Sequence, residues 1–123
     1  MQDLNHISSY KDLIVWQKAM DLVAAVYTLS DSLPKSELYG LASQMRRSAV
    51  SIPSNIAEGR RRGSIKYFRQ FLLIVYGSGA ELETQVEIAK RLKYGKAVDY
   101  VGVDELLDGI MRMLNKMTHG SIR

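Results

Sequence analysis

Arginine is the residue type whose arrangement in this chain offers the clearest chemistry. Between positions 46 and 69 the sequence holds seven cationic residues and one carboxylate, Glu58, so this basic window carries a net charge of +6 and leaves −2 for the rest of a +4 chain. Guanidinium groups bind phosphate through paired hydrogen bonds, and a concentrated basic region is how a surface meets a polyanion. The candidate nucleic-acid-binding residues are Arg46, Arg47, Arg60, Arg61, Arg62, Lys66 and Arg69, with Tyr67 interleaved as a base-stacking ring.

Two other interpretations of the basic window stay open. The basic end of a helical bundle can simply be solvated, and arginine-rich faces also form contacts between subunits or with an acidic partner protein. The direction in which the arginines point, toward solvent or toward a neighbouring subunit, discriminates between these possibilities. Nothing in the window reads bases in an identifiable code, so we expect phosphate contacts to dominate any nucleic-acid binding.

A second cluster of polar residues follows the proline inside the window. Pro53, Asn55, Glu58 and Gly59 lie close together in a segment whose apolar pattern is helical. Proline removes one backbone N–H from a helix, and the carbonyl that it frees needs another donor. A ligand or nucleotide contact is the alternative role. We favour the structural role because no nucleophile and base pair accompanies these residues in the same helix.

Patterns typical of catalysis or of metal binding do not emerge from the sequence. The chain has no cysteine, and its only imidazoles are His6 and His119. The glutamates around position 84 lack the Glu-x-x-His pairs that hold metals in helical bundles. The run Gly77-Ser78-Gly79 lacks the preceding strand and the following Lys-Ser or Lys-Thr of a phosphate-binding loop. We therefore expect no enzymatic activity, no catalytic residues, no metal and no cofactor.

Apolar residues recur at steps of three and four, which predicts four helices at about residues 10–32, 36–60, 64–94 and 103–118. Strand-like alternation of comparable length is absent from the sequence, and the connectors are short. The pattern therefore favours an all-α fold, a four-helix bundle with antiparallel up-down-up-down topology. The expected core stripes include Leu13, Trp16, Met20, Val23 and Tyr27 in the first helix and Phe68, Leu72, Val75, Gly79, Leu82, Val86 and Ala89 in the third.

Helix-capping residues mark several of the expected ends. Ser9, Ser36, Ser64 and Asp104 are candidate N-caps of the four helices. Pro53 predicts a bend rather than an end, because the apolar stripe continues past it. Glycines 59 and 63 are expected to terminate the second helix.

Length and hydropathy predict a single domain over residues 1–123. The N-terminal residues show neither a basic start nor an apolar run, so no signal peptide is readable. No apolar segment approaches the roughly 20 residues needed to cross a bilayer. We expect a cytoplasmic protein that does not associate with membranes.

Five segments together resemble a known family. They are Val15-Trp16-Gln17-Lys18-Ala19, Pro34 with Glu37-Leu38-Tyr39-Gly40-Leu41, Gln44-Met45-Arg46-Arg47-Ser48-Ala49, Ser51-Ile52-Pro53-Ser54-Asn55-Ile56-Ala57-Glu58-Gly59, and Gly77-Ser78-Gly79-Ala80-Glu81-Leu82-Glu83-Thr84-Gln85. The chain resembles the bacterial four-helix-bundle proteins encoded in intervening sequences of large-subunit ribosomal RNA genes, which carry an S23 ribosomal protein label. The resemblance spans about residues 10–117, and Asn55-Ile56-Ala57-Glu58-Gly59 is its most specific part.

The family resemblance implies a left-handed antiparallel bundle that assembles into a homopentameric ring. It also implies a distant similarity to the pentameric accessory variability protein of diversity-generating retroelements, a basic protein that works with nucleic acid. Together with the basic window, it favours a non-enzymatic protein that binds nucleic acid, RNA before DNA, through phosphate contacts. The alternative is a structural adaptor ring that docks a partner protein without binding nucleic acid directly.

Overall fold

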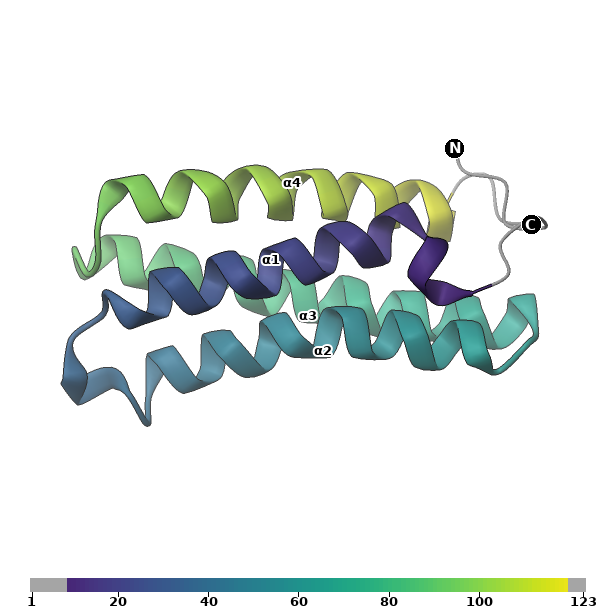
Figure 1. Ribbon diagram of the computed structural model, residues 1–123, viewed down its shortest axis with the longest axis horizontal. Coiled ribbons are helices and arrows are strands. Elements are labelled where there is room, and N and C mark those ends of the chain that lie inside the picture. Colours follow the sequence, from purple (N-terminus) through teal and green to yellow (C-terminus); the bar gives the residue numbers. More distant parts are fainter. Residues whose placement is uncertain (1–8, 120–123) are drawn as a thin grey trace.

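The computed structural model describes residues 9–119, and within them it contains four α-helices and no strand. The helices are α1 (Ile14–Asp31), α2 (Leu41–Arg61), α3 (Ile65–Arg91) and α4 (Ala97–His119), with short 3-10 helices η2 (Tyr10–Asp12) and η3 (Lys35–Glu37). The helices lie side by side along the long axis of the molecule (Figure 1). Helix α2 packs against α1 and α3, and α4 packs against α1 and α3, so each helix has two neighbours. The predicted four-helix bundle is confirmed.

The core stripe of α3 follows the sequence prediction, whereas that of α1 follows it only in part. All seven predicted α3 residues are buried, from Phe68 to Ala89. Of the residues predicted for the first helix, Leu13 is fully buried and Trp16 and Val23 pack against the core, but Met20 and Tyr27 are exposed by 46% and 42%. The buried α1 residues instead lie about one residue away around the helix, and apart from Ser30 they are Val15, Ala19, Leu22, Val26 and Leu29. Both faces of α1 are apolar, so only the packing of its neighbours determines which one is buried.

Helix α2 continues without a break past Pro53 and past Gly59, the first of the two glycines that were expected to end it. Pro53 is buried inside the helix, and Gly59 lies two residues before its last residue, Arg61. The prediction that Gly59 ends the helix was wrong. The lack of a side chain at Gly59 instead allows α2 and α3 to pack closely. A Cβ atom at Gly59 would lie 2.5 Å from the Cβ of Phe71 on α3. Gly63, with a φ of 80°, follows the helix in the left-handed conformation, as the terminating role requires.

The helix starts match the prediction at α3 only. The Ser64 hydroxyl accepts a hydrogen bond from the Tyr67 backbone N–H at 3.1 Å. Ser9 caps the 3-10 helix η2 rather than α1, which begins at Ile14. The N-cap residue of α2 is Gly40 rather than Ser36, and the Glu37 side chain caps the first helical N–H, since its Oε1 accepts a hydrogen bond from the Leu41 backbone N–H at 3.1 Å.

Helix α4 is longer than the sequence predicted. It begins at Ala97 rather than near residue 103, so the expected connector forms its first turns. Tyr100 packs into the core from this added segment. Asp104 lies inside the helix and is not its cap. Its carboxylate pairs with the Lys90 ammonium group of α3 at 2.7 Å.

Candidate nucleic-acid interface

The fold divides the basic window into two separate groups of cations. Arg46 and Arg47 lie in the first half of α2, whereas Arg60 and Arg61 lie at its end. Arg60 lies thirteen positions after Arg47 in the helix, which corresponds to about 20 Å along the helix axis. The sequence placed these residues in one contiguous window, but a helix lying along the bundle spreads them over its length.

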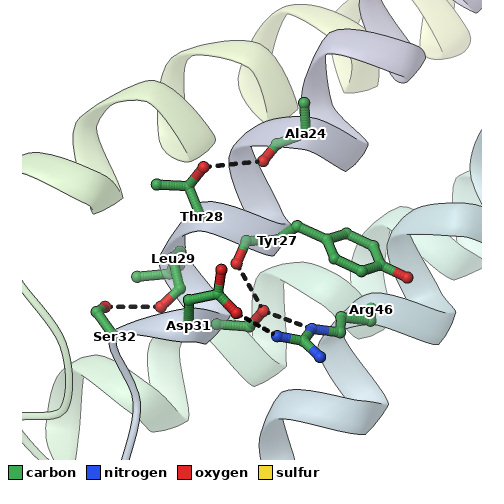
Figure 2. A network of polar contacts seen from close by, with 8 residues as sticks. Ala24, Tyr27, Thr28, Leu29, Asp31, Ser32 and Arg46 are labelled. Carbon is green, nitrogen blue, oxygen red and sulfur yellow. Dashed lines mark hydrogen bonds and ion pairs between the residues drawn. The ribbon is translucent and has the colours of Figure 1, made fainter.

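Arg46 joins α2 to the end of α1. Its guanidinium group lies 2.7 Å from the Asp31 carboxylate, donates from Nε to the Ser30 hydroxyl at 2.7 Å, and lies 4.8 Å from the Tyr27 ring centroid (Figure 2). The buried Ser30 hydroxyl donates in turn to the Tyr27 carbonyl at 3.0 Å. Only 24% of the Arg46 side chain is exposed. These contacts hold Nε and one terminal nitrogen of Arg46 against the protein and cover most of the side chain, which favours a structural role over phosphate binding.

The second group of cations lies where α2 turns into α3. Arg61 places its guanidinium 5.6 Å from the Tyr10 ring centroid, so it contacts the 3-10 helix η2. Arg62 pairs with Glu58 at 3.0 Å and lies 5.4 Å from the Phe71 ring centroid. Both side chains are exposed, so these contacts orient the arginines while leaving charge at the surface. Exposed ion pairs of this kind contribute little stability.

The remaining candidates of the window lie on the first turns of α3. Lys66 and Tyr67 are exposed, and half of the Tyr67 surface is open to solvent. Arg69 is half-buried and donates from Nε and from a terminal nitrogen to the Thr118 carbonyl at 3.3 and 3.0 Å. Arg69 therefore connects α3 to the last turn of α4. Arg60 is half-buried in the same region.

Two cations that the sequence reasoning missed join this end of the bundle. Lys11 belongs to η2, which packs on α2. Lys116 lies in the last turn of α4, two residues before Thr118, whose carbonyl Arg69 contacts. Both lysines are exposed. Figure 1 shows η2, the α2–α3 turn and the end of α4 at the same end of the molecule. We call the set the basic end, and it comprises Lys11, Arg60, Arg61, Arg62, Lys66, Arg69 and Lys116.

The basic end carries a strong excess of positive charge. It has seven cations, and the neighbouring carboxylates are Asp12, which follows Lys11 in the chain, and Glu58, which pairs with Arg62. The missed lysines are far in sequence from the centre of the basic window, so no local charge count includes them. A weak signal did exist, because Lys116 lies near the end of the fourth predicted helix, residues 103–118, and falls in the last turn of α4.

The polar cluster after the proline uses its hydrogen bonds within α2. The Asn55 amide donates to the Ser51 carbonyl at 2.8 Å, and the Ser51 hydroxyl donates to the Ser48 carbonyl at 2.8 Å. These bonds flank the Ala49 carbonyl, which Pro53 deprives of its usual helical donor. Glu58 pairs with Arg62 one turn later. The contacts favour the structural interpretation of this cluster, although the bonds reach the neighbouring carbonyls and not the freed one.

The described part of the chain, residues 9–119, contains no group of three or more His, Cys, Asp or Glu side chains that could hold a metal ion. His119 contacts the Thr118 hydroxyl through Nδ1 at 2.8 Å, while His6 lies outside the described residues. No helix in residues 9–119 is long and apolar enough to span a membrane.

An open groove of about 850 Å³ follows the outer surface of the first half of α2. Its lining includes Tyr27 of α1 and, from the turn before α2, Leu38 and Tyr39. Helix α2 contributes the rest of the lining, which is Ser43, Arg46, Arg47, Val50 and Ser51. We call it the α2 groove. It contains Arg46 and Arg47, the first group of cations of the basic window. The two groups of cations therefore lie on two different surfaces of the bundle.

The fold and the basic end define a small, basic four-helix-bundle protein. A family model described as 23S rRNA-intervening sequence protein matches residues 11–116. The chain belongs to this family, and the resemblance inferred from its sequence motifs is confirmed. No curated protein matches the chain.

A solved structure supports the fold. The chain is similar to a crystal structure of a protein with unknown function from the S23 ribosomal protein family of Bacteroides thetaiotaomicron VPI-5482, with a TM-score of 0.78 and 22% sequence identity. The match covers 86% of this chain and 99% of that chain. At this level of identity the similarity shows the shared fold alone.

Proposed function

We propose that this protein is a non-enzymatic cytoplasmic protein that binds nucleic acid, RNA in preference to DNA, by contacts between the basic end and backbone phosphates. The observation that carries the proposal is the convergence of seven cations from η2, α2, α3 and α4 at one end of the bundle. Helices η2 and α4 are distant in sequence from the α2–α3 turn, so the clustering arises from the fold. The family description, which refers to an intervening sequence of 23S rRNA, supports RNA as the polymer.

The proposal includes an antiparallel up-down-up-down, left-handed bundle that assembles as a homopentameric ring. Packing between consecutive helices, together with the packing of α1 on α4, supports this topology. Five basic ends repeated around one axis would bind a long polyanion with high effective concentration, so a ring gains affinity without any new type of contact. The expected mass is five times the 13.9 kDa of the chain, and light scattering measures it directly.

The test is fluorescence anisotropy of labelled RNA and DNA, single-stranded and duplex, at rising salt. The test variant replaces Arg61, Lys66 and Lys116 by Gln. The matched control variant replaces Lys18, Lys35 and Lys96, which are exposed and lie outside the basic end, so it loses the same charge. We expect the test variant to bind more weakly and with a shallower salt dependence, because fewer counterions are released. The control should resemble the native protein.

Absence of binding at low salt by the well-folded native protein would overturn the proposed function. Equal losses in both variants would show that net charge, and not the basic end, determines affinity. The first of these results would favour the adaptor function, in which the ring docks a partner protein.

A further inference from the structure

Tyr39 is the most exposed of the large apolar side chains in the described residues, with 93% of its surface open to solvent. It borders the α2 groove, where Leu38 and Val50 are also exposed, by 46% and 40%. A solvent-exposed ring beside a groove that is partly apolar offers a flat face for another planar group. The first question is whether the backbone holds this ring in place.

The turn that carries Tyr39 is fixed by its neighbours. The Glu37 carboxylate accepts hydrogen bonds from the Leu41 backbone N–H at 3.1 Å and from the Tyr94 hydroxyl at 3.2 Å. The Gly40 backbone N–H donates to the Glu37 carbonyl at 3.0 Å. A Cβ atom at Gly40 would lie 2.7 Å from Glu37 Oε1, so glycine leaves room for the capping carboxylate. Tyr39 is thus presented by a restrained turn, and binding would order little additional backbone.

The lining of the groove also includes a second ring and a cation. Tyr27 lies under the Arg46 guanidinium at 4.8 Å, and Arg46 is in turn held by Asp31 at 2.7 Å. Arg47 is exposed on the groove and has no ion-pair partner among residues 9–119. Ser43 and Ser51 lie one helical turn before and after Arg47, and both line the groove. The groove therefore combines aromatic faces, one uncompensated guanidinium and hydroxyl donors.

This combination fits a nucleotide, which has both a planar base and a phosphate. An aromatic face binds a planar base, and a guanidinium with hydroxyl neighbours binds a phosphate oxygen. A duplex keeps the faces of its bases stacked inside, whereas a single strand exposes them. We propose that the α2 groove binds an unpaired nucleotide of a single-stranded nucleic acid, with the base stacked on Tyr39 and its phosphate on Arg47. This inference deepens the proposed function and rests on it, but it uses a surface separate from the basic end.

The experiment introduces a fluorescent reporter at the stacking position. The double variant Trp16→Phe/Tyr39→Trp has its single tryptophan in the groove, because Trp16 is the only tryptophan of the native chain. It is titrated with a ten-nucleotide oligouridylate and with an RNA duplex of equal length. We expect the single strand to quench the emission of the introduced tryptophan saturably and the duplex to leave it unchanged, since the basic end binds a duplex without stacking. A parallel titration of Tyr39→Trp with Trp16 retained guards against instability of the double variant.

Affinity measurements on an otherwise native chain complete the test. Tyr39→Ala is expected to weaken oligouridylate binding roughly tenfold or more, the range found for loss of one stacked base. Tyr39→Phe should bind like the native protein, because it keeps the ring. Arg47→Ala should also weaken single-strand binding, whereas Leu92→Ala, a matched exposed apolar truncation at the end of α3, should not. Duplex binding should be the same for all of these variants.

Two results separate this inference from the proposed function. If the native protein binds single strands and duplexes, but neither the emission of the introduced tryptophan nor the affinity of Tyr39→Ala changes, the groove inference is wrong and the basic end still stands. If the native protein binds neither polymer, both proposals fail. Binding of single strands that is lost in Tyr39→Ala and retained in Tyr39→Phe supports the groove as the stacking site.

Discussion

The Thr118 carbonyl accepts two hydrogen bonds from the Arg69 guanidinium, at 3.0 and 3.3 Å. Carbonyls in the last turn of a helix have no partner within the helix, and the negative end of the helix dipole attracts cations. Arg69 satisfies both requirements for α4. Arg69, which the sequence indicated as a phosphate ligand, therefore also links α3 to the end of α4.

Replacing Arg69 by Met is expected to lower the free energy of unfolding by about 1–2 kcal/mol, because the carbonyl loses a charged donor while most of the side-chain volume stays. Lys66→Met, at an exposed position on the same helix, should change it by less than about 0.5 kcal/mol. Urea denaturation measures both values. Amide hydrogen exchange in the last turn of α4 should accelerate in Arg69→Met. Equal losses of unfolding free energy in the two variants would contradict a structural role for the contact between Arg69 and Thr118.

Gly59→Ala tests the close approach of α2 and α3. The added Cβ would lie 2.5 Å from the Phe71 Cβ, so the helices must separate, and we expect a loss of about 1–3 kcal/mol in the free energy of unfolding. Gly77→Ala is the matched control, because beyond its chain neighbours and the backbone of its own helix no atom lies within 4 Å of its added Cβ. Alanine favours the helix over glycine, so this control should gain roughly 0.5–1 kcal/mol. A stabilised Gly59→Ala protein would refute the packing role.

Arg46 and Arg47 are adjacent in sequence but should differ in their effect on stability. Arg46→Ala removes contacts with Asp31, Ser30 and Tyr27, and we expect it to lower the free energy of unfolding by about 1–2 kcal/mol, with little of this from the exposed Asp31 partner. Arg47→Ala should leave stability within about 0.5 kcal/mol. Thermal and urea denaturation of the two variants compare them directly, and similar losses would show that Arg47 also has a structural contact.

Tyr100 makes stability sensitive to alkaline pH. Burial raises the pKa of its hydroxyl above the ordinary value, and the negative charge of Asp104 raises that pKa further. The raised pKa favours the neutral hydroxyl in the folded protein, so its contribution is complete below the unfolded-state pKa of about 10 and is lost as the pH rises through the folded-state pKa. Urea denaturation at several pH values from about 8 to 11 measures this loss.

Tyr100→Phe is the variant that isolates this titration. It removes the hydroxyl that donates to the Tyr94 carbonyl at 2.7 Å, so stability at neutral pH should fall by about 1 kcal/mol. Its decline at alkaline pH should then be shallower than that of the native protein. Tyr94, whose pKa is raised by burial and by the hydrogen bond to Glu37, remains and should keep part of the decline. Parallel curves for the two proteins would exclude Tyr100 as a contributor.

The sequence predicted α3 well because its apolar residues form one continuous stripe with a capping serine before it. It predicted α1 poorly because the stripe through Met20 and Tyr27 has the same spacing as the buried one through Val15 and Leu29. Periodicity cannot choose between two apolar stripes offset by one residue, since that choice depends on where the other helices lie. Glu37 was missed as a cap because the chain forms a 3-10 turn before α2 begins.

Only the part of the candidate site that is close together in sequence could be predicted from the charge pattern. Arg61, Arg62 and Lys66 lie together in the structure because they flank one short turn. Lys11 and Lys116 reach the same end through tertiary packing, which a local charge count does not include. The α2 groove also escaped prediction, because Tyr27 and Tyr39 come from segments on either side of a turn whose geometry depends on the Glu37 cap.

The short turn at Gly63 also has a consequence for how fast the chain folds. Only three residues, Arg62 to Ser64, separate α2 from α3, so bringing these two helices together costs little loop entropy. We expect the α2–α3 hairpin to form in the folding transition state and the pairing of α1 with α4, the most distant in sequence, to follow it. Gly59→Ala should then slow refolding more than it speeds unfolding in stopped-flow measurements. A molecule built this way reaches its fold from the middle of the chain outward.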